Sequence, residues 1–326
     1  MKKGTKNAAV ATENTIEKSI EESMKSVKTL SKKGLEILAH RIDAMIYFSV
    51  ENANPNGDPN FGNGGPRLTS DGRGLITDVC IKHWIRVQLY LMGYPVLVLP
   101  DDMIHDGCKS ISERLAKNER LQAAIKANDF DLAEKIAAET WIDVRMFGAL
   151  LPIKNVGSIS VKAPVSVELA KSVGLVNVVE HGITKCLSYK QGSDSDRMGS
   201  KSLVEFGLYG FGVSISPYKA EQVGFTNQDA EILHEALKHL FDETDSAARP
   251  VGSMNVESVY WWNHDADGDG KLPRVPAKIV RDSVQYMKKG DEFEHPHSMK
   301  DFELVTKKID GIVEPDVYAP GQQTNA

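Results

Sequence analysis

Apolar and polar positions along the chain follow two different periods, which predicts a mixed α+β protein. Residues 45–50 form an apolar run of strand length, whereas residues 76–91 place apolar side chains at helical spacing. Thr77 and Asp78 offer the capping chemistry that starts this helix. The same criteria predict further elements downstream: strands at 95–99, 183–189, 203–213, 256–262 and 302–306, one or two helices within 110–138, and a helix over 227–241.

The segment between the first strand and the first helix is rich in Asn, Pro and Gly. It runs from residue 51 through several glycines to Arg67 and Arg73, a composition that favours loop over regular structure. In the helix that follows, Lys82 and Arg86 are four residues apart and share one face. A strand, a glycine-rich loop and a helix with paired cations can hold a polyanion. The alternative is that the loop is two consecutive turns and that Asp78 and Lys82 form an ordinary surface ion pair.

Composition is that of a globular protein, with 41% hydrophobic and 26% charged residues among 326. The formal net charge is −6, but it is unevenly distributed. Residues 150–220 carry an excess of three positive charges and residues 221–326 an excess of nine negative ones, so a local basic groove is compatible with an acidic protein. The sequence contains no apolar run of membrane-span length and no secretory signal core, and its three cysteines are widely separated, which predicts a cytoplasmic location.

Two stretches, residues 50–59 (VENANPNGDP) and 74–82 (GLITDVCIK), closely resemble the crRNA-binding backbone subunit of CRISPR type I Cascade, in the type I-C/I-B branch of the RAMP superfamily. The resemblance covers most of 41–310 and is dense at 45–92, 141–217 and 246–249. It implies an α+β, elaborated RRM-like (ferredoxin-like) domain over 41–326, with inserted fingers and a thumb hairpin at about 185–206. Residues 1–40 fall outside it and are expected to be a partly helical or flexible extension.

The resemblance also implies a function. It predicts a non-catalytic subunit that oligomerises along CRISPR guide RNA and supports guide–target DNA pairing in antiviral defence. The implied partners are the guide RNA, the target DNA strand, further copies of the chain and other Cascade subunits, with no membrane, metal or cofactor. The candidate RNA-binding residues are Asn54, Asn56, Arg67, Arg73, Lys82, Arg86, Arg145, Lys162, Lys185, Arg197, Met198, Lys201 and Arg249.

The chain departs from the family pattern in its first helix, where His83 and Trp84 stand in place of two cations. Either RNA affinity is weaker for that reason, or Trp84 serves packing. In a later stretch Asp143 and Arg145 are spaced so that they could form a structural ion pair. Residues 265–270 imitate the start of a calcium loop but lack its later glutamate, so we expect no metal there.

Two other functions remain open on the sequence. One is a metal-dependent endoribonuclease of the same superfamily that uses a loop aspartate such as Asp58. The other is an assembly scaffold whose RNA contacts have been lost.

Overall fold

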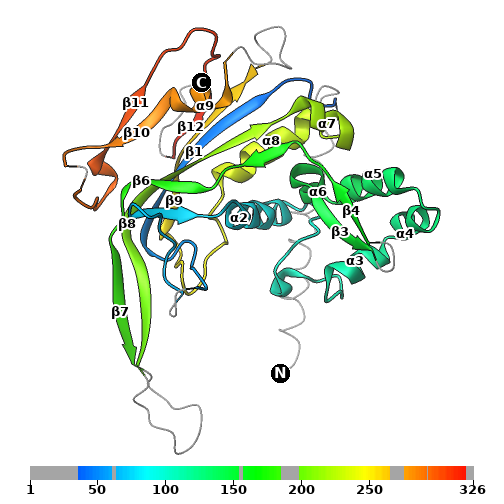
Figure 1. Cartoon of the computed structure of the whole chain (residues 1–326), viewed down its shortest axis with the longest axis horizontal. Helices are drawn as coiled ribbons and strands as arrows, with labels where there is room; N and C mark the ends of the chain where they lie inside the picture. The colour runs from blue at the N-terminus through cyan, green and yellow to red at the C-terminus, as the bar shows by residue number, and fades with distance from the viewer. Residues whose placement is uncertain are drawn as a thin grey trace, which may run out of the picture.

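The computed structural model describes residues 36–60, 64–153, 157–184, 198–264, 275–291 and 293–320. Their main feature is an eight-stranded antiparallel sheet in the order β12-β9-β1-β8-β6-β2, with β5 and β7 also paired to β8 (Figure 1). Its strands are β1 (Ile42–Ala53), β2 (Arg73–Ile76), β5 (Val165–Val167), β6 (Ala170–Leu175), β7 (Val178–Thr184), β8 (Met198–Ile215), β9 (Met254–Asn263) and β12 (Asp316–Tyr318).

Successive side chains of a strand point to opposite sides of the sheet. Apolar side chains lie on both sides, and other elements cover each face. Ile46 and Phe48 of β1 face the main core, where helices α2 (Asp78–Leu91) and α8 (Asn227–Lys238) pack. Tyr47 faces a second core. The second core is covered by α9 (Ala277–Asp282), β10 (Val284–Lys288) and β11 (Phe302–Thr306). The remaining short helices are α7 (Pro217–Val223) and the 3-10 helices η2 (Asp101–Met103) and η4 (Met299–Asp301).

The order β1–α2–β6–β8–α8–β9 follows a βαββαβ pattern, the arrangement of ferredoxin-like folds. The predicted α+β class is therefore confirmed, while the RRM-like assignment stays a prediction. Thr77 caps α2 as expected, since its side chain accepts a hydrogen bond from the Cys80 N–H. No described helix is both long and apolar enough to cross a membrane.

Residues 110–161 build a separate helical lobe with its own apolar core (Figure 1). It contains α3 (Ile111–Lys117), α4 (Glu119–Lys126), α5 (Phe130–Thr140), α6 (Ile142–Phe147), β3 (Ala149–Ile153) and β4 (Gly157–Val161). We expected one or two helices over residues 110–138, and the structure has three. Asn118 and Asp129 are the reason, because each side chain accepts a backbone N–H and so begins a new helix.

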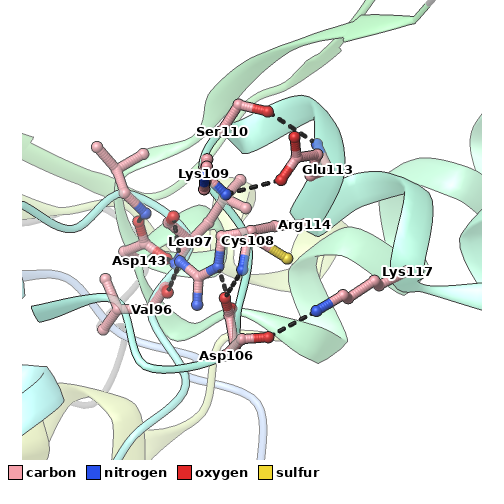
Figure 2. A network of polar contacts seen from close by, with 11 residues as sticks. Val96, Leu97, Asp106, Cys108, Lys109, Ser110, Glu113, Arg114, Lys117 and Asp143 are labelled. Atoms are coloured by element: carbon pink, nitrogen blue, oxygen red, sulfur yellow. Dashed lines mark hydrogen bonds and ion pairs between the residues drawn. The ribbon is translucent and has the colours of Figure 1, made fainter. Parts of the chain in front are cut away.

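The apolar run over residues 95–99 is not a strand, so that prediction was wrong. The Asp143 carboxylate accepts the N–H groups of Leu97 at 2.8 Å and Val98 at 3.2 Å, and Arg114 donates to the Leu97 carbonyl at 2.5 Å (Figure 2). Side chains thus satisfy backbone groups that a neighbouring strand would otherwise pair. Val96 and Leu97 of the run are buried, and their burial requires no sheet partner.

A long hairpin of β7 and β8 extends away from the body of the protein (Figure 1). Its pairs run from Val178 opposite Val204 to Thr184 opposite Met198. The hairpin lies where the resemblance predicts the thumb, and residues 185–197, which follow β7 in the sequence, fall outside the described residues.

Candidate nucleic-acid interface

Three loops meet beside the beginning of α2, and the third comes from far along the chain. Residues 54–58, 64–67 and 246–249, together with residues 78–83 of the helix, form what we call the α2 loop surface. The Asn54 N–H donates to the Ala248 carbonyl at 2.9 Å, and the Asp58 N–H donates to the Gly65 carbonyl at 2.8 Å. Backbone bonds therefore fix the three loops against one another.

Asn and Gly are needed in the first loop because its backbone runs close to the second. A Cβ added at Gly57 would lie 2.6 Å from the Gly64 carbonyl oxygen, a distance that real side chains do not adopt. The Asn54 amide donates to the same carbonyl at 2.7 Å. The loop composition that first suggested turns is therefore the composition required for two loops in backbone contact.

The α2 N-terminus is tied to this surface by a side chain of the first loop. Asn56 Oδ1 accepts the Thr77 N–H at 3.0 Å and the Thr77 hydroxyl at 3.2 Å. The Thr77 hydroxyl in turn accepts the Cys80 N–H at 3.3 Å. The positive end of the helix dipole is thus held at the loops, where it favours an anion.

Arg249 lies between the first loop and α2. Its guanidinium carbon is 5.8 Å from the centre of the Trp84 ring, and Nη1 donates to the Pro55 carbonyl at 3.4 Å. Trp84 is fully buried and packs edge-on against Phe48, so the expectation that it serves packing is confirmed. Thr77 and Trp84 were not among the candidate binding residues, yet both position the surface; the helix cap and the helical apolar spacing were the signals for them.

The α2 loop surface contains buried polar atoms without a hydrogen-bond partner among the described residues. They are Nε of Arg67, Nε of Arg249 and Oδ1 of Asn54. Arg67 forms an ion pair with Asp58 at 3.4 Å, but through Nη1. Unpartnered buried donors are uncommon in folded proteins because they cost free energy. The two guanidinium groups lie beside one another's loops, and a phosphate accepts hydrogen bonds from such groups readily.

Burial sets the protonation of two side chains at this surface. Burial raises the pKa of the Cys80 thiol to about 11, although Arg249 and Arg67 act in the opposite direction. Burial also lowers the pKa of His83, and the cations Arg249 and Arg86 lower it further. At neutral pH His83 is therefore uncharged, and the positive charge of the surface comes from arginine and lysine.

Lys82 and Arg86 lie one helical turn apart but have different partners. Lys82 forms an ion pair with Asp78 at 2.9 Å, a contact that the surface-pair alternative expected. Arg86 Nε is 3.1 Å from Asp143, whose side chain is only 1% exposed, and the guanidinium lies 5.3 Å from the centre of the Phe147 ring. Arg86 thus joins α2 to the helical lobe.

The expected pairing of Asp143 with Arg145 is wrong. Arg145 binds Asp229 of α8 through two bonds, at 3.0 and 2.7 Å, and donates to the Ala138 carbonyl at 2.7 Å. Residues two apart on a helix do not face each other, so the two side chains of α6 reach different neighbours.

The remaining candidates are dispersed. Arg73 is exposed at the start of β2 and donates to the Val173 carbonyl at 2.9 Å. Lys162 is exposed beyond the end of β4, beside a cavity bordered by α5 and α7. Lys201 in β8 donates to the Ala247 carbonyl at 2.5 Å, which joins the hairpin to the α2 loop surface. Lys185 and Arg197 lie outside the described residues, and Met198 is described by its backbone alone.

The loop acid considered as a catalytic group has local partners. Asp58 Oδ2 is 3.4 Å from Arg67, and Oδ1 accepts the Asn60 N–H at 3.0 Å. Over the part of the chain that the structure describes, no three His, Cys, Asp or Glu side chains form a group that could hold a metal ion. The calcium-like segment, residues 265–270, lies outside that part.

Comparison with known proteins gives one strong match. Two solved structures are similar to the chain at 14% identity: one from a "CRISPR RNA-guided surveillance complex" (68% of each chain, TM-score 0.40), and one titled "CRISPR RNA-guided surveillance complex, pre-nicking" (74% of this chain and 84% of that one, TM-score 0.43). These TM-scores are too low to carry an argument. No curated protein matches the sequence significantly. The family model for CRISPR-associated protein Cas7, however, matches residues 40–307, most of the chain. The chain therefore belongs to the Cas7 family of CRISPR-associated proteins.

Proposed function

We propose that the chain is a non-catalytic backbone subunit that binds CRISPR guide RNA and lines up in several copies along it, within a Cascade surveillance complex. Its partners are then the guide RNA, the target DNA strand that pairs with the guide, further copies of itself and other Cascade subunits. Membership of the Cas7 family supports the class of function. The α2 loop surface supports the place of RNA binding.

The observation that carries the proposal is the placement of the Arg67 and Arg249 guanidinium groups close to the N-terminus of α2, each with an Nε that has no hydrogen-bond partner among the described residues. Lys82 is 24% exposed and, among the described residues, forms an ion pair with the half-exposed Asp78, so it is a cation that can exchange this partner for a phosphate. Such groups bind the sugar–phosphate backbone and do not read bases. That is the requirement for a subunit that holds a guide of any sequence and leaves recognition to base pairing.

The β7–β8 hairpin is proposed to act as the thumb. Lys201 attaches its base to the α2 loop surface, so RNA held there would pass beside the hairpin. Arg197 and Met198 near the tip suit contact with a displaced base, because a cation and a flexible thioether can pack on an aromatic ring.

Two measurements test the proposal. Protein purified from its host should carry RNA, which appears as a raised ratio of absorbance at 260 to 280 nm. In the stripped protein, Arg67→Ala and Lys82→Ala should each lower the slope of log affinity against log salt by about 0.7, the value for one contact to a single-stranded phosphate. Lys126→Ala, an exposed lysine of α4, is the matched control. RNA-free protein together with unchanged slopes in both variants would contradict the proposal.

A further inference from the structure

The structure contains a second basic site, on the other face of the sheet from α2. A cavity of about 840 Å³ lies between β1, β6, α9 and β10. Tyr47 and Met45 of β1 line it, and these are the side chains of β1 that point away from the main core. We call this cavity the β10 pocket.

Alternation along β6 and a glycine in β8 shape the pocket. Lys171 and Val173 line it, whereas Ser172 between them is buried on the opposite face. Lys171 lies opposite Gly210 in the β6–β8 pairing. A Cβ at Gly210 would approach the Tyr47 ring to 2.7 Å, so the glycine leaves room for that ring beside the cavity.

The lining of the β10 pocket is positive although the chain as a whole is negative. Its cations exceed its carboxylates by two, with Asp71 and Asp282 against Arg73, Lys171, Lys278 and Lys288. Asp71 lies 3.3 Å from Arg73, and Asp282 lies 2.7 Å from Lys278. Lys171 is exposed and has no ion-pair partner within 4.0 Å among the described residues, so its charge is available to a ligand.

Aromatic rings accompany these charges. Tyr286 lies edge-on to Tyr47, with 4.9 Å between the ring centres, and is only partly buried. Phe293 also lines the pocket and is 75% exposed, which is unusual for a side chain of its size. A groove that combines lysine and arginine with accessible aromatic rings is typical of proteins that bind single-stranded nucleic acid, in which phosphates meet cations and bases stack on rings.

We infer that the β10 pocket binds a single-stranded nucleic acid, a strand distinct from the RNA on the α2 loop surface. An acidic peptide would satisfy the cations but would leave Phe293 and Tyr286 without a partner, whereas unpaired bases use both. The pocket and the α2 loop surface lie on opposite faces of one sheet, so the two strands bind separately. Pairing of a guide with one strand of a duplex releases the other strand, which supplies a ligand of this class in the proposed function.

Purified full-length protein, with any RNA it carries left in place, provides the test. The probe is a fluorescent oligothymidylate of about ten nucleotides, within the site size of single-strand binders. Lys171→Gln combined with Lys288→Gln should weaken its binding about tenfold or more and reduce the salt slope by about 1.4, or 0.7 for each phosphate contact. The matched control is Lys117→Gln combined with Lys126→Gln in the helical lobe. Thermal midpoints of both double variants show whether each has folded, and Lys171→Gln alone, at an exposed position, replaces the first if it has not.

A second measurement locates the bound oligonucleotide on the protein. With bromouracil in the oligonucleotide, ultraviolet crosslinking should label a peptide that contains Tyr286 or Phe293, and Phe293→Ala should reduce the yield. Unchanged affinity in the pocket variant would overturn the inference, as would loss of binding in Lys82→Ala instead, since the probe would then occupy the α2 loop surface. Displacement by polyglutamate but not by unlabelled oligothymidylate would show a site for acidic peptides. Copurified RNA reports on the proposed function separately, because only variants of the α2 loop surface should lose it.

Discussion

Replacing Arg86 with Ala separates a structural role from an RNA contact. In the wild type the buried Asp143 carboxylate has three donors, Arg86 Nε at 3.1 Å and the N–H groups of Leu97 and Val98 (Figure 2 shows its surroundings). Removal of one partner of a buried ion pair costs about 3–5 kcal/mol. Because Asp143 keeps two backbone donors, we expect the lower end, about 3 kcal/mol. At about 2–4 °C per kcal/mol, the thermal midpoint should fall by roughly 6–12 °C.

The control for this variant lies one turn earlier on the same helix. Lys82→Ala removes an equal charge from an exposed pair that is worth about 0.3–0.5 kcal/mol, so its midpoint should change by no more than about 2 °C. In the RNA titration the order should reverse, with Lys82→Ala giving the larger loss of salt slope. Differential scanning fluorimetry and fluorescence anisotropy measure the two effects on the same samples.

A double variant tests the cause. Arg86→Met with Asp143→Asn removes both charges, and it should regain at least about 1 kcal/mol of the stability lost in Arg86→Ala, because no buried carboxylate is left unpaired. The reasoning would be refuted if Arg86→Ala melted like the wild type while its salt slope fell, since the guanidinium would then serve RNA and not Asp143.

Three further predictions concern other groups. Arg145→Ala should lower stability by about 3 kcal/mol or more, since Asp229 is buried and bound at two positions, yet leave the salt slope of RNA binding unchanged; a lower slope with normal melting would contradict this. Burial lowers the pKa of His234, stacked on Trp261, from 6.5 to about 4, so its contribution to stability is complete above pH 6.5 and declines as the pH falls towards 4, by about 3 kcal/mol at pH 4. Urea melts of His234→Phe should show a shallower loss between these pH values, and an identical curve would refute the assignment. Guide-length RNA should stay intact when the wild type is incubated with Mg²⁺ or Mn²⁺; cleavage that Asp58→Ala abolishes would instead establish the ribonuclease alternative.

Local sequence patterns were sufficient to predict the helices that pack one apolar face on the sheet. The helix at α2 was predicted from apolar spacing and from Thr77, and α8 from the same spacing, because each packs one apolar face on the sheet. Residues 95–99, whose backbone binds Asp143, were predicted wrongly as a strand. An apolar run is a sign of burial, and its partner in this case is a carboxylate from a helix more than 40 residues further along the chain.

Side-chain partners were much less accessible to sequence reasoning. Arg86 was a candidate RNA contact because it shares a helix face with Lys82, and Arg145 because of the family resemblance. The fold gives each a buried carboxylate partner that no local spacing indicates. The lysines of the β10 pocket were missed for the opposite reason. Lys171 and Lys288 are more than 100 residues apart and belong to no sequence motif. Only the folded structure brings them to one cavity.

The length of β8 has a mechanical consequence. The strand has 18 residues, or roughly 60 Å at about 3.3 Å per residue, and it serves both the body, where it pairs with β1, and the protruding hairpin, where it pairs with β7. The two pairings overlap at Val204, so no loop separates them. A force applied to the far end of the hairpin therefore acts on the body through one continuous strand. The hydrogen bond from Lys201 to the Ala247 carbonyl connects that strand to the loops beside α2. In the proposed row of subunits, a load on one hairpin would reach the α2 loop surface of the same copy before any neighbour had moved.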